Sequence, residues 1–413
     1  MRVVRSSGAY SARNTGPELT APVAEIIGAV RAGGDAAVLS LTERFDKAEL
    51  GPDHLQVDAN ELESSVGILE QEVLTGLRTA IANVRAVARA QMRDEPVRVE
   101  LPEGHIVEVA ERPVRRAAVY VPGGRSPYPS TVVMGAITAR VAGVEEIVVC
   151  APPGPGGRAH PVILAACVLC GVTEVYRMGG AQAIAALAYG TESVPAVDVI
   201  VGPGNPYVQE AKRQVVGRVG IDGIAGPSEL VVIASGSADP ELIALDLMAQ
   251  AEHGADSPVW CLSPDDRLLD AVADAIERLA PERPSVADAE AQLMETNDLE
   301  EALRLTESMA PEHLQLMGEE AEALADRVRN AGCLFVGAGA ATAFGDYVAG
   351  SNHVLPTGGA ARFQSALSPA TFRRRMARVS LPREAAARLA PAGAAIARAE
   401  GFPVHAESME RRA

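Results

Sequence analysis

The feature that most constrains the fold is an alternation of short apolar runs with helical patterns along the middle of the chain. Residues 117–121 form an apolar run that ends in Pro122-Gly-Gly, and a helical apolar pattern follows over 132–141. The same order of strand, Gly/Pro turn and helix then repeats. Strands and helices that alternate at this spacing are typical of βαβ units, which build parallel sheets. The other predicted strands are 145–150, 173–178, 197–201, 230–234, 258–262 and 333–336.

Helical patterns without such strands flank this region on both sides. We therefore expect an α/β protein with two Rossmann-like parallel-sheet halves, a helical N-terminal segment and a helical C-terminal arm. The arm is rich in alanine and poor in large apolar residues, so we expect it to pack on another surface. The expected boundaries are 1–112 for the N-terminal segment, 113–228 and 229–369 for the two halves, and 370–413 for the arm.

Composition excludes several classes of protein. With 413 residues, of which 48% are hydrophobic, the chain can bury a large core. A net charge of -17 argues against a nucleic-acid partner. The chain has no signal-peptide core and no apolar run of the ~20 residues that a membrane span requires. Its five cysteines do not form a disulfide framework, and we expect Cys167 and Cys170 to be buried thiols. These features predict a cytoplasmic protein without a membrane partner.

Three predicted strands end in loops that combine glycine with a polar side chain. They are Pro122-Gly-Gly-Arg-Ser-Pro-Tyr-Pro, Gly179-Gly-Ala-Gln182 and Gly202-Pro-Gly-Asn205. Ligands of open parallel sheets bind beyond the carboxyl ends of the strands, so these loops indicate a nucleotide-sized ligand; ordinary turn chemistry is the alternative. The usual dinucleotide fingerprint is missing, because Gly337-Ala-Gly339-Ala-Ala-Thr342 lacks its third glycine. We interpret that stretch as a tight turn before a short helix.

Candidate metal ligands occur at the end of a predicted helix. Gln250 and His253 are three residues apart, which would place both side chains on one helical face. The alternative is a solvated helix end. With Asp346 and His405 they make a set of two imidazoles and two oxygen ligands, which suits zinc and would also accept other first-row metals.

Glu312-His313 is the best candidate acid/base pair. It follows a helix stop, so we expect it on a loop or at a strand start, where neighbouring side chains point in opposite directions and could serve different steps. A charged surface dipeptide is the alternative. His353 is either a ligand or a turn residue that supports one.

The chain resembles histidinol dehydrogenase from about residue 20 to His405. The resemblance depends on long motifs that occur in the same order. They are Tyr120-Val-Pro-Gly-Gly-Arg-Ser-Pro-Tyr-Pro-Ser, Gly202-Pro-Gly-Asn-Pro-Tyr-Val, Ala225-Gly-Pro-Ser-Glu, Gln250-Ala-Glu-His-Gly, Pro311-Glu-His-Leu and Gly345-Asp-Tyr-Val-Ala-Gly-Ser-Asn-His-Val-Leu-Pro-Thr.

This resemblance implies oxidation of L-histidinol to L-histidine with two NAD+, through a bound aldehyde. It implies a homodimer with a shared active site, one Zn2+ per subunit, and Glu312 and His313 as acid/base residues. The implied zinc ligands are Gln250, His253, Asp346 and His405; the implied substrate contacts are Ser228, Gln250, His253, His313, Asp346, Glu400 and His405; and the implied NAD contacts are Tyr120, Gln182 and Asn205.

Two other functions stay open. A related zinc- and NAD-dependent dehydrogenase could act on another small alcohol, and a zinc protein without redox activity could be a hydrolase or a binding protein. Glu400 and His405 suit an amine and an imidazole and argue against the first. The Glu312-His313 pair and the three strand-end loops argue against the second.

Overall fold

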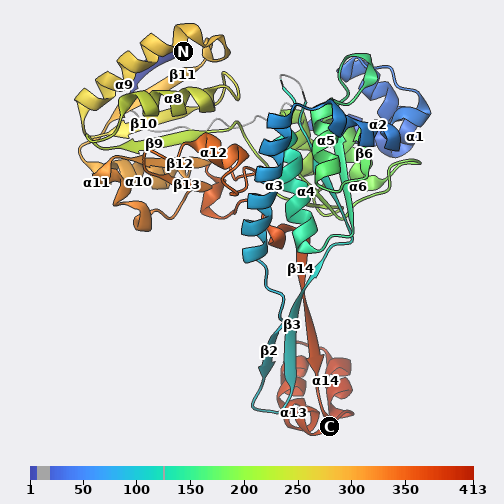
Figure 1. The fold of residues 1–413 in the computed structure, drawn as a ribbon. Helices are drawn as coiled ribbons and strands as arrows, with labels where there is room; N and C mark the ends of the chain where they lie inside the picture. The colour runs from blue at the N-terminus through green and yellow to red at the C-terminus, as the bar shows by residue number, and fades with distance from the viewer. Residues whose placement is uncertain (7–18, 124–125) are drawn as a thin grey trace.

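A computed structural model describes residues 1–6, 19–123 and 126–413, which form two α/β lobes joined to a narrow stalk (Figure 1). The first lobe contains a parallel five-stranded sheet in the order β6-β5-β4-β7-β8. The chain runs outward from β4 through β5 to β6 and then returns to β7 on the other side of β4. The strands are β4 (Arg116–Tyr120), β5 (Glu146–Ala151), β6 (Glu174–Arg177), β7 (Val199–Val201) and β8 (Gly220–Ile221).

Helices cover both faces of this sheet. Along β4, Ala117 and Val119 pack with α3, α4 and α5, whereas Ala118 and Tyr120 pack with α1, α6 and α7. Successive side chains of a strand point to opposite faces, so a strand covered on both sides must be apolar throughout. The helices are α1 (Thr20–Asp46), α2 (Ala59–Ser64), α3 (Gln71–Ala90), α4 (Pro129–Ala142), α5 (Pro161–Leu169), α6 (Gly180–Tyr189) and α7 (Pro206–Val215).

The second lobe contains a parallel six-stranded sheet in the order β1-β11-β10-β9-β12-β13. Leu230 and Val232 of β9 pack with α8 and α9, and Val231 and Ile233 pack with α10 and α11. The strands are β1 (Arg2–Ser6), β9 (Leu230–Ala234), β10 (Val259–Ser263), β11 (Glu290–Glu295), β12 (His313–Met317) and β13 (Cys333–Val336). The helices are α8 (Pro240–Ala251), α9 (Asp266–Leu279), α10 (Leu299–Met309), α11 (Glu319–Glu322) and α12 (Thr342–Tyr347).

The expectation that residues 1–112 are a helical segment is wrong at both ends. Residues 2–6 form β1, which pairs with β11 and packs Val3 on the core of the second lobe. The last part forms β2 (Val97–Glu100) and β3 (Ile106–Pro113). Between these strands α1, α2 and α3 are helical, as expected, and they cover the first lobe. The strand conformation of β1 results from its pairing with β11. Without β1, that edge of β11 would be unpaired.

The prediction of helix from residue 370 onward is also wrong for its first part. β14 (Arg373–Ser380) pairs with β3 in an antiparallel sheet of order β14-β3-β2, which forms the stalk. Its side chains are mostly exposed, so the strand lacks the apolar alternation that would reveal it in the sequence. The helices α13 (Arg383–Ala399) and α14 (Pro403–Glu410) follow and lie at the far end of the stalk from both lobes (Figure 1).

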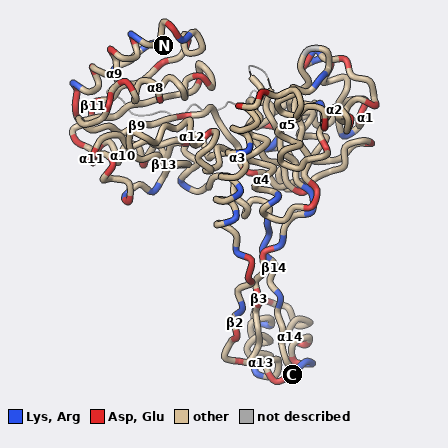
Figure 2. Tube along the Cα trace, viewed as in Figure 1, with Lys and Arg blue, Asp and Glu red and all other residues tan. Residues whose placement is uncertain are grey.

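Three of the four arginines of β14 are paired with acidic residues. Arg373 and Arg375 contact Glu111 at 3.4 and 3.3 Å, and Arg378 contacts Glu108 at 3.0 Å. Figure 2 shows basic and acidic residues intermixed along both lobes and the stalk. The arginine run of the stalk is therefore not an isolated basic patch. In the parts of the chain described above, no helix is both long and apolar enough to cross a membrane.

Candidate active site

The candidate catalytic residues lie at the amino ends of β9 and β12, which are neighbours in the second sheet. His313, the first residue of β12, pairs in register with Leu230, the first residue of β9. Ser228 and Glu312, just before these strands, are thereby brought together. The three predicted ligand loops follow the carboxyl ends of strands in the first lobe. In the second lobe, the cluster instead lies at the amino ends of the strands.

A chain of hydrogen bonds connects three of the predicted site residues. Nε2 of Gln250 donates to Oγ of Ser228 at 2.6 Å, and this hydroxyl donates to Oε2 of Glu312 at 2.5 Å. Gln250 is 1% exposed, and its Oε1 has no hydrogen-bond partner among the described residues. A buried amide oxygen without a partner is costly unless a ligand satisfies it. This oxygen is therefore suited to a metal ion or another ligand.

Glu312 and His313 do not point in opposite directions, as an extended chain would have them. Nδ1 of His313 lies 3.4 Å from Oε2 of Glu312. The reason is that Glu312 precedes the strand and its carboxylate turns toward β9, where it accepts hydrogen bonds from Oγ of Ser228 and from the backbone N–H of Glu229. The pair is buried, so the alternative of a charged surface dipeptide is excluded.

Two carboxylates determine the charge state of His313. Its Nε2 lies 3.6 Å from Oδ1 of Asp346. Burial alone would lower the pKa of His313, but Glu312 and Asp346 outweigh burial and raise it well above the ordinary value. Burial would likewise raise the pKa of Asp346, but His313 lowers it below the ordinary value. His313 and Asp346 thus each favour the charged form of the other.

His253 lies in a turn after α8 and not on the helix itself. The helix ends at Ala251, and the exposed His253 donates its backbone N–H to the carbonyl of Gln250 at 3.3 Å. Its side chain remains near Asp346, although His313 contributes more than His253 to lowering the pKa of that carboxyl. The turn therefore directs Gln250 inward and His253 toward solvent, in contrast to the single helical face that their spacing predicts.

Glu400 and His405 are not brought to this cluster within one chain. Glu400 caps the end of α13 and His405 lies in α14, at the far end of the stalk (Figure 1). Among the residues that the structure describes, no three His, Cys, Asp or Glu side chains are grouped closely enough to hold a metal ion. Of the four predicted ligands, Gln250, His253 and Asp346 belong to the second lobe, and His405 would have to come from another chain.

His353 supports Asp346 and connects the two lobes. Its Nδ1 lies 2.9 Å from the backbone oxygen of Asp346, and its Nε2 lies 3.2 Å from Oγ1 of Thr131 at the start of α4. Burial lowers the pKa of His353. Protein groups therefore occupy both ring nitrogens of His353. This favours the alternative of a turn residue that supports the site over that of a metal ligand.

The three strand-end loops of the first lobe meet at the carboxyl edge of its sheet. The hydroxyl of Tyr120 accepts the backbone N–H of Gly180 at 3.1 Å. Gly202 has φ 117°, and a Cβ there would lie 2.1 Å from the carbonyl oxygen of Tyr120, so only glycine fits. β4 and β7, which carry these residues, lie where the strand order reverses, the usual position of a nucleotide. Gly124 and Arg125 of the first loop lie outside the described residues.

The predicted cofactor residues differ in their surroundings. Gln182 is 1% exposed, and its Oε1 has no partner among the described residues, while its Nε2 donates to Asp46 at 3.5 Å. Burial raises the pKa of Asp46 to about 6. Asn205 uses its Oδ1 to cap α7 through the N–H of Val208. Gln182 therefore has an oxygen available for a ligand, and Asn205 has an ordinary structural role as well.

An ion pair outside the predicted site holds one of these loops. Nζ of Lys212 donates to the carbonyl of Gly202 at 3.0 Å and contacts Asp222, which in turn accepts the N–H of Gly202 at 2.7 Å. Lys212 is 1% exposed. Only one other lysine, Lys47, occurs in the chain. One of the two lysines of the chain, 10 positions after Gly202, is the feature of the sequence that could indicate this contact.

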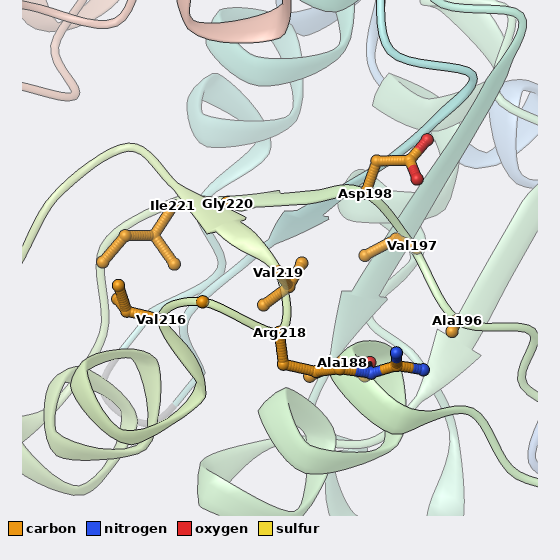
Figure 3. Close-up of a pocket in the computed structure, with 10 residues that line it drawn as sticks. Ala188, Ala196, Val197, Asp198, Val216, Arg218, Val219, Gly220 and Ile221 are labelled. Carbon is orange, nitrogen blue, oxygen red and sulfur yellow. Dashed lines mark hydrogen bonds between the residues drawn. The ribbon is translucent and has the colours of Figure 1, made fainter. Parts of the chain in front are cut away.

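A hollow of about 620 Å³ lies elsewhere on the first lobe (Figure 3). Asp198, directly before β7, and Arg218 lie on its border, so it opens at the amino edge of the sheet. Asp198 accepts the backbone N–H groups of Arg115 and Arg116, and Arg218 donates to the carbonyl of Ala188. None of the predicted site residues lines this hollow, and its charged groups already have partners.

Comparison with known proteins agrees with the resemblance in the sequence. The family model for histidinol dehydrogenase matches residues 11–413. A histidinol dehydrogenase of Parasynechococcus marenigrum is 47% identical over 393 residues, which cover 94% of this chain and 89% of that protein. One from Cereibacter sphaeroides is 47% identical over 408 residues, covering 97% and 93%.

A solved structure has the same fold. The crystal structure of histidinol dehydrogenase from Elizabethkingia anophelis matches with a TM-score of 0.92 and 31% identity, covering 100% of this chain and 98% of that one. The likeness spans both lobes, the stalk and the tail. Fold, sequence and family model thus agree over nearly the whole length, and the chain belongs to the histidinol dehydrogenase family of oxidoreductases.

Proposed function

We propose that the protein oxidises L-histidinol to L-histidine, as a step of histidine biosynthesis, with two NAD+ and through bound L-histidinal. The observation that carries the proposal is the buried set of Ser228, Glu312 and His313 beside the unpartnered oxygen of Gln250. The names of the relatives support the substrate.

The protein's own groups supply the proton transfers. Nε2 of His313 takes the proton of the substrate hydroxyl, which requires a neutral ring. Glu312 takes a proton from the water that adds to the aldehyde, since an aldehyde must be hydrated before it can lose a second hydride. Both groups are buried and fixed by hydrogen bonds, which favours one orientation.

The residues of the second lobe fit a zinc ion. Gln250 has a buried oxygen without a partner among the described residues, and the lowered pKa of Asp346 favours the carboxylate form that binds a cation. With His253 and with His405 of a second subunit they form the proposed ligand set. When bound, Zn2+ supplies a positive charge that orients the imidazole and amine of the substrate and offsets the charge of Asp346 beside His313.

The tail supports a homodimer with shared active sites. Phe402 and Val404 of the tail are 52% and 72% exposed, and the tail packs mainly on itself through small residues. Beside α12, which carries Asp346, an apolar hollow of about 460 Å³ is lined by residues such as Phe344. An exposed apolar tail on one chain and an apolar hollow beside the cluster on another suit a symmetric exchange of tails. Glu400 and His405 would then complete the partner's site.

The carboxyl edge of the first sheet is the proposed NAD+ site. The free oxygen of Gln182 and the side chains of Tyr120 and Asn205 would hold the cofactor, which accepts the hydride. This edge adjoins the catalytic cluster, because Thr131 at the start of α4 contacts His353, and His353 contacts Asp346. We propose that the enzyme works in the cytoplasm.

A panel of alcohols tests the substrate. We expect NADH formation with L-histidinol at a kcat/KM far above that with amino alcohols lacking the imidazole or with imidazole alcohols lacking the amine. Equal activity with an amino alcohol that lacks the imidazole would favour a related dehydrogenase. Absence of NADH formation with every alcohol, in zinc-loaded protein, would favour a zinc protein without redox activity.

A further inference from the structure

Glu229 is a buried acid that none of the predicted site roles includes. It stands directly before β9 and is 3% exposed. Its Oε1 accepts two backbone N–H groups, from Glu312 at 3.2 Å and from Gly358 at 2.9 Å. One carboxyl oxygen therefore joins the start of β12 to the segment that follows α12.

The backbone of Glu229 holds the same two catalytic residues. Its N–H donates to Oε2 of Glu312 at 2.9 Å, and its carbonyl oxygen accepts the N–H of His313 at 3.2 Å. Nδ1 of His313 lies 3.1 Å from that carbonyl oxygen, to which it donates when it carries a proton. A proton kept on Nδ1 leaves Nε2 of the neutral ring as the proton acceptor, so this contact also favours the tautomer that the reaction needs.

The Gly358 contact extends this network to the other lobe. Thr357, the preceding residue, accepts the backbone N–H of Gly226 through its Oγ1. The same segment contains His353, which contacts the backbone oxygen of Asp346 and Oγ1 of Thr131. Glu229 thus lies where the start of β9, the start of β12 and the segment joining the lobes meet.

We propose that Glu229 is a positioning residue, whose side-chain oxygen acts as a double hydrogen-bond acceptor that fixes Glu312 and His313 relative to the 353–358 segment. This role requires a side chain at position 229 that is long enough to place a hydrogen-bond acceptor beside the N–H groups of Glu312 and Gly358. It requires neither a charge on Glu229 nor a proton transfer by it. The inference rests on the proposed function for its kinetic test, and a second readout is independent of activity.

Three substitutions separate the effect of side-chain length and acceptor at position 229 from the effect of its charge. Glu229→Gln keeps the oxygen and the length but loses the charge. Glu229→Asp keeps the charge but is one methylene shorter, so it cannot serve both N–H groups. Glu229→Met keeps the length without any acceptor. We expect Gln to retain kcat within about threefold, and Asp and Met to lower kcat roughly 10²-fold with smaller changes in KM, since a misplacement of about 1 Å can cost that much.

Hydrogen exchange followed by mass spectrometry provides the independent readout. Peptides over 311–317 and 355–360 should exchange faster in the Asp and Met variants than in the Gln variant, because the N–H groups of Glu312 and Gly358 lose their acceptor. Glu72→Gln, an exposed change on α3, is the matched control. If the Met variant does not fold, the comparison of Asp with Gln decides alone.

Two results would overturn the inference. An active Asp variant with an inactive Gln variant would show that charge matters and not the acceptor. Unchanged exchange at both peptides in a folded Asp variant would show that Glu229 does not hold these amides. If the unsubstituted enzyme fails to oxidise L-histidinol, the proposed function fails, whereas the exchange comparison still tests the positioning role.

Discussion

Oγ of Ser228 lies between Gln250 and Glu312: it accepts from the amide of Gln250 at 2.6 Å and donates to the carboxylate of Glu312 at 2.5 Å. One hydroxyl thereby orients two groups with different proposed tasks. Because the amide nitrogen of Gln250 is directed to Ser228, its oxygen is directed away and stays available for a ligand. Because the hydroxyl proton goes to Glu312, the carboxylate is held beside His313.

Ser228→Ala should therefore weaken both catalysis and metal retention. It removes a hydrogen bond to a charged group, typically about 1.5–3 kcal/mol, so kcat/KM for L-histidinol should fall roughly 10–100-fold. Zinc should also be lost more readily to a chelator. Steady-state kinetics and metal analysis measure both effects, with Ser64→Ala on the exposed side of α2 as the control. Full activity and normal metal retention would show that the hydroxyl orients neither group.

Glu312→Gln should separate the two oxidations. Glu312 is proposed to activate water for the second step, so the variant should lose aldehyde oxidation by roughly 10²–10⁴-fold and retain more of the alcohol oxidation. Assays that start from L-histidinol and from L-histidinal measure the steps independently. An equal loss in both would remove the specific role of Glu312 in hydration.

Shared sites predict complementation between inactive subunits. His253→Ala and His405→Ala should each be inactive, but a mixed dimer would contain one site with both histidines intact. With random exchange about half of the dimers are mixed, so activity should return to roughly a quarter of the unsubstituted level. If exchanged, folded dimers stay inactive, the tail serves its own chain.

Glu229 predicts a pH-dependent stability. Burial and the neighbouring Glu312 raise its pKa to about 7. A carboxyl with a raised folded-state pKa stabilises the fold fully below its unfolded pKa, and this contribution is lost as pH rises through the folded pKa. Between about pH 4.5 and 7 the loss amounts to about 3 kcal/mol.

The comparison of melting temperatures with Glu229→Gln measures this loss. The variant has no such proton to lose, so its melting temperature relative to the unsubstituted protein should rise from about pH 4.5 to about pH 8. Glu72→Gln should show no such trend. A constant difference across this range would show that Glu229 ionises normally in the folded protein.

Much of the α/β framework could be predicted because its strands are buried on both faces. The predicted bounds of β9 and β13 agree with the structure, and Gly337 forms the expected tight turn before α12. Residues 97–100 and 373–380 could not be identified in the same way, since their side chains are mostly exposed and only pairing with β3 makes them strands.

The site was predictable in part. The motifs around Gln250, Glu312 and Asp346 identified residues that the fold brings together. The relative positions of these side chains depend on tertiary structure. No local sequence pattern predicts the turn that exposes His253 or the direction of the Glu312 carboxylate, which lies beside the ring of His313. Glu229 occurs in the quoted motif Ala225-Gly-Pro-Ser-Glu, but its role depends on partners 83 and 129 positions away in the chain.

The stoichiometry of the complete reaction tests the central claim most directly. A limiting amount of L-histidinol is converted by the zinc-loaded enzyme with excess NAD+, and both the NADH formed and the organic product are quantified. The account predicts two NADH per L-histidinol, with L-histidine as the product and no free aldehyde accumulating. One NADH per L-histidinol with release of L-histidinal, or no NADH at all, would contradict it.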